Sequence, residues 1–246
     1  MAPGAQAPRG GRYAGWPAAF SCPARSHNTA RWIVNGEQST RRPPQPPGPQ
    51  KNLERATQLA FDKLEGQTRE QLVWLGAEPT ATGCRLRVLD DWFEVDLQTR
   101  RVVLPGGRPV RPHWGILALH YLAVRTRPER LAPEVTFADL AAARSYASVY
   151  DGRVIGRLCG TVGREAEMLQ TAAKRLGGHR ALGGDLAFDF DVFPRVNLRL
   201  VWHEPDEEFP PSATLLLPAN IEEYFCAEDI VVLSESLVAR LAGRPF

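Results

Sequence analysis

The feature that most constrains this chain is the segment at residues 184–209, GDLAFDFDVFPRVNLRLVWHEPDEEF. Apolar and polar residues alternate on both sides of Pro194, and the alternation of a β-strand places its odd and even residues on opposite faces. The segment therefore predicts a β-hairpin whose turn spans residues 192–196. Its apolar face pairs Phe190 with Leu198, Phe188 with Leu200 and Leu186 with Trp202. Its polar face pairs Asp189 with Arg199, Asp191 with Asn197 and Asp185 with His203. One register satisfies both faces, which a wrong register rarely does.

An acidic stretch follows this hairpin and is the main candidate for a site. Carboxylates beside an imidazole suit a divalent metal ion or general acid–base chemistry. The candidate ligand-binding residues are Asp185, His203, Glu204, Asp206, Glu207 and Glu208, and the candidate metal ligands are His203, Asp206 and Glu207. The alternative is a solvated loop in which Asp185 and His203 form a cross-strand hydrogen bond. Phe209 is expected to anchor the loop.

A second pattern of period two covers residues 84–104 and predicts a small antiparallel meander. If Asp90 and Asp91 form its first turn, apolar residues share one face and opposite charges the other. In that register Val88 faces Phe93, Leu86 faces Val95, Arg87 faces Glu94 and Arg85 faces Asp96. A second turn is expected near residues 98–99.

The remaining periodic segments predict helices. Residues 113–125 are apolar almost all round, which indicates a helix buried in the core. Other helices are expected near residues 53–64, 68–75, 146–162 and 164–176, with a C-terminal helix at 227–242. Strands grouped together rather than alternating with helices favour an α+β fold, with β-hairpin or meander units at about 84–104 and 184–217. His120, within the apolar helix, is interpreted as a core histidine.

The first 50 residues differ from the rest. They hold six arginines against one glutamate and 9 of the 21 prolines, without apolar periodicity, so we predict a disordered basic arm. Residues 51–246 are then a single α+β domain. Apart from weak contact by this basic arm, nucleic acid is not an expected partner. Because Met1 and Met168 are the only methionines, a non-standard start near residue 50 is an alternative.

Several function classes lack their signals. The longest apolar run, residues 114–124, is too short for a membrane span of about 20 residues, so a soluble cytoplasmic protein is expected. The four cysteines form no CxxC pair, which indicates a reducing compartment and argues against a cysteine-ligated metal or iron–sulfur site. The sequence has no GxGxxG after a predicted strand, no Walker-type loop, no GxSxG and no HExxH.

The order of several motifs resembles a family of bacteria and archaea named domain of unknown function 3786. The motifs are LHYL at 119–122, TFADL at 136–140, GGD at 183–185, FPRVNLRLVWHEPDEEFP at 193–210, SATLLLPANIEEYF at 212–225 and AEDIVVLSESL at 227–237. The resemblance covers about residues 52–242 and implies no particular activity. Some members carry an added cysteine-rich iron–sulfur module; Cys22 stands alone in this chain, so no iron–sulfur cluster is expected.

We therefore expect a cytoplasmic accessory or binding domain for a small molecule, a cofactor or a metal, with its pocket between the second hairpin and the apolar helix. One alternative is a metal-assisted hydrolase that uses the Asp/Glu/His cluster to position a divalent ion and activate water. The other is a protein-interaction module whose basic arm contacts an anionic partner.

Overall fold

A computed structural model describes residues 49–129, 134–141, 143 and 147–246, with backbone alone for 49–51. Its contacts divide the chain into two units, Met1–Gln45 and Pro46–Phe246, and only the second is described here. The predicted disordered arm lies outside the described residues, except that Pro49 and Gln50 already belong to the first helix.

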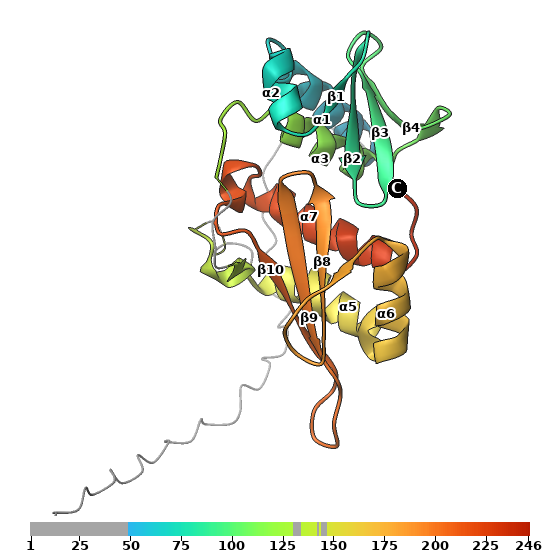
Figure 1. Ribbon diagram of the computed structural model, residues 1–246, viewed down its shortest axis with the longest axis vertical. Helices are drawn as coiled ribbons and strands as arrows, with labels where there is room; N and C mark the ends of the chain where they lie inside the picture. Colours follow the sequence, from blue (N-terminus) through green and yellow to red (C-terminus); the bar gives the residue numbers. More distant parts are fainter. Residues whose placement is uncertain (1–48, 130–133, 142, 144–146) are drawn as a thin grey trace, which may run out of the picture. The chain divides into compact units, whose positions relative to one another are not determined.

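The described chain contains helices and strands in the order that the sequence pattern predicts (Figure 1). The α-helices are α1 Pro49–Lys63, α2 Arg69–Trp74, α3 Pro112–Leu122, α4 Ala147–Tyr150, α5 Gly156–Gly160, α6 Ala166–Arg175 and α7 Ala227–Leu241. The other helical turns are η1 Phe137–Asp139, η3 Asp151–Ile155, η4 Val162–Arg164 and η5 Ile221–Glu223. The predicted helix at 146–162 is in fact α4, η3 and α5 in succession, and η3 is a π-helical turn.

Two antiparallel five-stranded sheets complete the α+β fold. The first has the order β1-β2-β3-β4-β5, from β1 Glu78–Pro79, β2 Gly83–Val88, β3 Asp91–Asp96, β4 Arg101–Leu104 and β5 Arg108–Pro109. The second has the order β6-β10-β9-β8-β7, from β6 Val135–Thr136, β7 His179–Arg180, β8 Leu186–Phe193, β9 Val196–His203 and β10 Ser212–Leu217. The outer strands β1, β5, β6 and β7 have two residues each and were not predicted.

The register of the second hairpin, β8 with β9, is the predicted one. The apolar pairs Leu186–Trp202, Phe188–Leu200 and Phe190–Leu198 are present, as are the polar pairs Asp189–Arg199 and Asp191–Asn197. The predicted turn at 192–196 is too long, because both strands continue until only Pro194 and Arg195 separate them. An irregularity between Asp191 and Phe193 keeps Phe193 and Val196 paired and buried at the tip.

The register of the first hairpin, β2 with β3, differs from the prediction by two residues. Leu86 pairs with Phe93 and Val88 with Asp91, so the turn consists of Leu89 and Asp90. A shift of two leaves each side chain on its expected face, because the side-chain period of a strand is two. Leu89 has a left-handed φ of 51°. Its buried side chain and its N–H, which donates to the Val192 carbonyl, fix this turn against the second hairpin.

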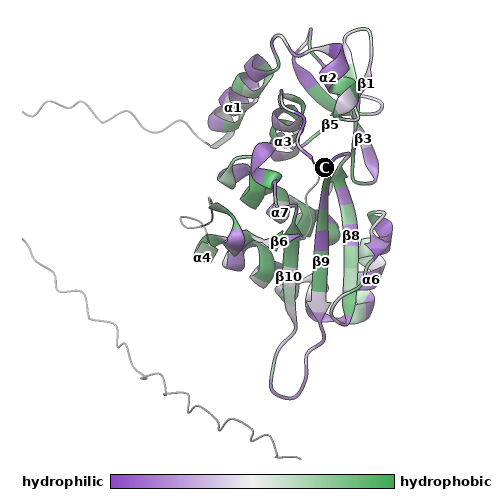
Figure 2. Ribbon diagram, turned by 60° about the vertical axis from the view of Figure 1, so that its left-hand side comes forward, coloured by the Kyte–Doolittle hydropathy of each residue, from purple (hydrophilic) through white to green (hydrophobic). Residues whose placement is uncertain are grey.

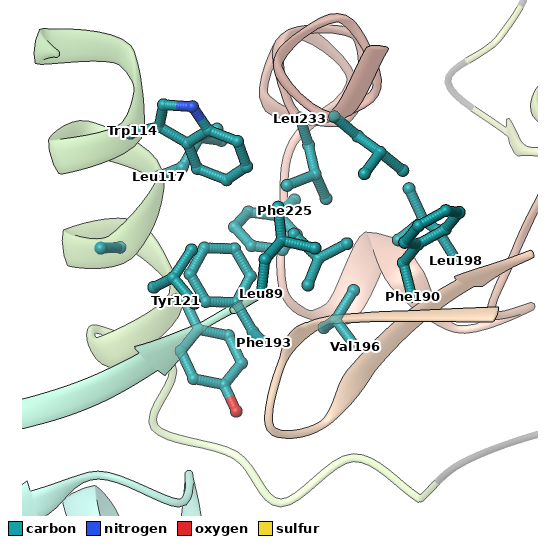
Figure 3. Packing of buried hydrophobic residues seen from close by; sticks show 14 of the residues in the cluster. Leu89, Trp114, Leu117, Tyr121, Phe190, Phe193, Val196, Leu198, Phe225 and Leu233 are labelled. Atoms are coloured by element: carbon teal, nitrogen blue, oxygen red, sulfur yellow. The ribbon is translucent and has the colours of Figure 1, made fainter. Parts of the chain in front are cut away.

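Helix α3 lies in the core, as its all-round apolar sequence predicts. Seven of its eleven residues are buried, and the helix ends at Leu122, three residues before the predicted end. Figure 3 shows Trp114, Leu117 and Tyr121 of α3 facing side chains from both hairpins and from α7. Tyr121 stacks on Phe193 at the tip of the second hairpin, with ring centroids 4.7 Å apart.

Helix α7 packs on α3 and lies between α3 and strand β10 in both views (Figures 1 and 2). Its apolar residues join the same core, and beyond its end Phe246 packs edge-on against Phe93 and Trp114. On the second sheet, the buried Trp202 donates its indole N–H to the Gly163 carbonyl at 2.7 Å. Across the described ranges, no helix combines the length and the apolar character that crossing a membrane requires.

Candidate functional site

The polar end of the second hairpin brings Asp185 and His203 together. His203 Nδ1 lies 3.8 Å from Asp185 Oδ2, and both side chains are more than half exposed. The same carboxylate accepts a hydrogen bond from the Glu204 N–H at 2.9 Å. The two residues face each other across the strands as predicted, but at 3.8 Å they form an ion-pair contact and not the expected hydrogen bond. Such a pair in solvent contributes little to stability.

The acidic loop that follows is organised by Asp206. Its Oδ1 accepts hydrogen bonds from the backbone N–H groups of Glu208 and Phe209 at 2.8 and 2.7 Å. Glu207 and Glu208 are exposed. Phe209 is 65% exposed, so the expectation that it anchors the loop is wrong. Asp206 closes the loop through backbone contacts instead.

In the described ranges, no group of three or more His, Cys, Asp or Glu residues is arranged to hold a metal ion. That His203, Asp206 and Glu207 bind a metal stays a prediction. The role of Asp185, His203, Glu204, Asp206, Glu207 and Glu208 in ligand binding stays a prediction.

A concave site lies between α3 and α7, with η3 and α5 along its side and α1 at its edge. Its cavity volume is about 540 Å³. The apolar part of the wall includes Leu53, Ala56, Ile116, Leu117 and Val232. We name this cavity the α3–α7 cleft. It shares the apolar helix with the pocket that the sequence predicted, but its second wall is α7, because the second hairpin packs directly on Tyr121.

His120 and Asp229 join the two helices at one wall of the α3–α7 cleft. His120 Nδ1 lies 2.9 Å from Asp229 Oδ2, and the side chains are 19% and 15% exposed. The Lys63 ammonium lies 3.5 Å from His120 Nε2. Because an ammonium group can only donate, this contact assigns the acceptor role to Nε2 and the proton to Nδ1, which donates to Asp229. His120 is thus hydrogen-bonded, as interpreted, but it borders a cavity.

Asp229 also accepts a hydrogen bond from a second neighbour. The Cys226 thiol lies 3.2 Å from the same Oδ2. Burial acts to raise the pKa of Asp229, whereas the hydrogen bonds from His120 and Cys226 act to lower it. The hydrogen bonds outweigh burial, so the pKa of Asp229 lies below its ordinary value. Burial raises the pKa of the Cys226 thiol, which disfavours a thiolate nucleophile at neutral pH.

Arginines dominate the polar part of the α3–α7 cleft. Its lining contains Arg111, Arg153, Arg157, Arg240 and Arg244, with the carboxylates Glu228, Asp229 and Glu235. Glu235 accepts two hydrogen bonds from the Arg153 guanidinium, at 2.8 and 2.6 Å. This contact raises the pKa of Arg153. The cleft thus contains both fixed and unpaired positive charges.

Sequence reasoning missed Asp229, Arg153, Glu235 and the other arginines of the cleft. Asp229 is in the first turn of α7, where acidic residues are common for helix stability alone. Arg153 and Glu235 are 82 residues apart. No local pattern relates such residues, since only the packing of α7 against α3 and η3 brings them together.

These observations define an α+β domain with a charged cleft between two core helices. The family model described as Domain of unknown function (DUF3786) matches residues 73–240, which include both sheets, α3 and nearly all of α7. The chain belongs to this family. The match leaves out α1 and Arg244, which contribute to the edge of the cleft. No curated protein and no solved structure matches the chain.

Proposed function

We propose that this protein is a binding domain that holds a small organic molecule in the α3–α7 cleft. The observation that carries this proposal is the cleft itself. Its volume of about 540 Å³ falls within the roughly 300–1,000 Å³ typical of small-molecule sites. An apolar wall with a few oriented polar groups is the usual composition of such sites.

The orientation of its polar groups supports a preformed site. The His120–Asp229 contact joins α7 to α3, and the Arg153–Glu235 contact joins α7 to η3. Side chains that are already held in place lose little conformational entropy when a ligand binds. A cleft braced in this way presents its donors and acceptors before a ligand arrives.

Ligand-observed NMR with a library of fragment-sized acids, bases and neutral aromatics tests the proposal. Val232→Trp adds a large side chain to the wall of the cleft, and Val73→Trp places the same side chain on the exposed face of α2. We expect fragments that bind the wild-type protein to lose binding to Val232→Trp and keep it with Val73→Trp. Equal binding to both variants, or no binding fragment at all, contradicts the proposal.

The acidic end of the second hairpin remains a separate prediction, supported by the Asp185–His203 pair. The metal-assisted hydrolase depends on the same residues. Thermal shifts with Mg²⁺, Mn²⁺, Zn²⁺ and Ca²⁺, compared between the wild-type protein and His203→Gln, test both ideas. The interaction module depends on the basic arm, which is outside the described residues, and truncation of residues 1–48 tests it.

A cytoplasmic location is also part of this proposal. Cys84, Cys159 and Cys226 are free thiols, and disulfides are rare in the reducing cytosol. Fractionation of cells that produce the protein, followed by immunoblotting, tests the location.

A further inference from the structure

We infer that the ligand of the α3–α7 cleft is an organic acid, a carboxylate or a phosphate ester attached to an apolar group, and that Arg157 binds its acidic group. This inference rests on the proposed function and names the ligand class. The juxtaposition that carries it is a set of unpaired guanidinium groups beside an apolar wall in one cavity.

The positive charges of the cleft fall into two sets. Arg153 is held by Glu235, while Arg240 contacts Asp90 at 3.2 Å and lies over the ring of Phe246. Arg111, Arg157 and Arg244 form no ion pair or side-chain hydrogen bond with the part of the chain that is described. Asp229 is engaged by His120. The unpaired arginines therefore outnumber Glu228, the one lining carboxylate that the described chain leaves without such a contact.

Arg157 is the best placed of the three unpaired arginines, because it is partly buried, whereas Arg111 and Arg244 are exposed. The planar donors of a guanidinium match the two oxygens of a carboxylate or phosphate, and Arg157 has no anionic partner among the described residues. A bound acid supplies the missing anion. Arg111 and Arg244, at the exposed edge, add to the attraction.

The backbone before Arg157 supports a functional role for this wall. Asp151–Ile155 form a π-helical turn, in which the Gly156 N–H donates to the Asp151 carbonyl five residues earlier. Such turns are rare and frequently occur at functional sites. In this wall, Arg153 and Arg157 both line the cleft while Val154 and Leu158 are fully buried.

The N-terminal end of α3 adds to the positive electrostatic potential of the cleft. Arg111, His113 and Trp114 line the cleft, so the N-terminal end of the helix borders it. The N-cap residue Arg111 makes no side-chain capping hydrogen bond. Free N–H groups and the positive end of the helix dipole favour an anion nearby. This contribution supports the arginines and does not define a site alone.

Calorimetric titration with four probes tests the ligand class: benzoate, phenyl phosphate, the neutral benzamide, and inorganic phosphate. We expect benzoate or phenyl phosphate to bind at least about tenfold more tightly than benzamide, as one lost charge-assisted hydrogen bond implies. Their affinity should fall as the salt concentration rises. Arg157→Gln should weaken binding of the acids by about tenfold or more and leave benzamide unchanged.

Arg111→Gln, at the start of α3, is a second variant and is expected to have a smaller effect in the same direction. Arg69→Gln, at an exposed position that lines none of the described cavities, is the control and should change nothing. Benzamide binding as tightly as benzoate, or acid binding that survives Arg157→Gln, overturns the inference. Inorganic phosphate binding as tightly as phenyl phosphate overturns the organic part of it.

The two proposals fail in different ways. If neutral fragments bind in the cleft and are blocked by Val232→Trp, while the acids do not bind, the ligand class is wrong and the binding function stands. If neither the fragments nor the four probes bind, both proposals are wrong.

Discussion

Tyr121 and Phe193 stack almost parallel, with ring centroids 4.7 Å apart and an interplanar angle of 12°. Tyr121 comes from α3 and Phe193 from the tip of the second hairpin, so this contact joins the core helix to the second sheet. The Tyr121 hydroxyl also donates to the Leu75 carbonyl at 2.6 Å. One side chain thus links α3, the second hairpin and the end of α2.

Phe193→Ala should lower the free energy of unfolding by about 3–5 kcal/mol, because it removes a buried aromatic ring and leaves a cavity against Tyr121. Phe209→Ala is the matched control on the loop after the same hairpin. Its ring is 65% exposed, so the expected change is below about 0.5 kcal/mol. Urea unfolding measures both values. Similar losses in the two variants would contradict the assignment of the hairpin tip to the core.

Gly76→Ala should cost more than Gly66→Ala, although both glycines follow helices with a positive φ, of 82° and 74°. A Cβ at Gly76 would lie 2.5 Å from Pro194 Cβ, whereas one at Gly66 would have no neighbour closer than 3.9 Å. Gly66→Ala is expected to lose about 1–2 kcal/mol from backbone conformation. The clash adds about 1–3 kcal/mol in Gly76→Ala. Equal losses of unfolding free energy in chemical denaturation would show that the end of α2 does not pack on the turn of the second hairpin at Pro194.

Asp229→Asn should reduce stability at neutral pH and lose its effect in acid. The folded-state pKa of Asp229 lies below the ordinary 3.8, so the carboxylate stabilises the fold above that pH. This contribution disappears as the pH falls through the folded-state pKa, where the native carboxylate is protonated. The difference in unfolding free energy between wild type and Asp229→Asn should be largest above about pH 5 and shrink below it.

The control for this pH series is Asp185→Asn, because the Asp185 side chain is 57% exposed. Its unfolding free energy should differ little from that of the wild type across the series. A difference for Asp229→Asn that persists undiminished at low pH would mean that the carboxylate charge does not hold α7 to α3.

Asp206→Ala should loosen the acidic loop without changing global stability appreciably. The substitution leaves the Glu208 and Phe209 N–H groups without their acceptor. Cleavage by a glutamate-specific protease within residues 204–208 should become about fivefold faster, as expected for a lost contact of about 1 kcal/mol. Asp206→Asn keeps an acceptor oxygen and should stay near the wild-type rate. An unchanged rate in Asp206→Ala would show that other contacts order the loop.

The second hairpin could be predicted in register because both of its faces carry information. Any slip of one residue would expose Phe188 and Leu200, and a buried face penalises this strongly. The first hairpin shows the limit of the same pattern. A slip of two preserves the faces, so the alternation alone does not distinguish the two registers. In the structure the buried Leu89, with a left-handed φ, forms the turn. The outer strands of two residues are too short to show any period.

The cleft could not be predicted because its chemistry depends on contacts between helices distant in sequence. His120 was interpreted as a core histidine, and its partner Asp229 lies 109 residues further along the chain. The acidic stretch after the second hairpin was a stronger local signal, yet its Asp206 serves the backbone of its own loop. Charge density in a sequence indicates solvent exposure as readily as it indicates a site.

The π-helical turn at Asp151–Ile155 has a consequence for how the η3 and α5 side of the α3–α7 cleft can change. A π turn corresponds to one additional residue within an α-helical path, and one residue of an α-helix corresponds to about 100° of rotation. Loss of a single codon at Gly152 would remove the additional residue and restore regular winding, with α4 and α5 keeping their faces. Arg153, which lies within the turn, would be re-aimed relative to Glu235, so one deletion changes the charge arrangement of the cleft while the rest of the wall stays the same.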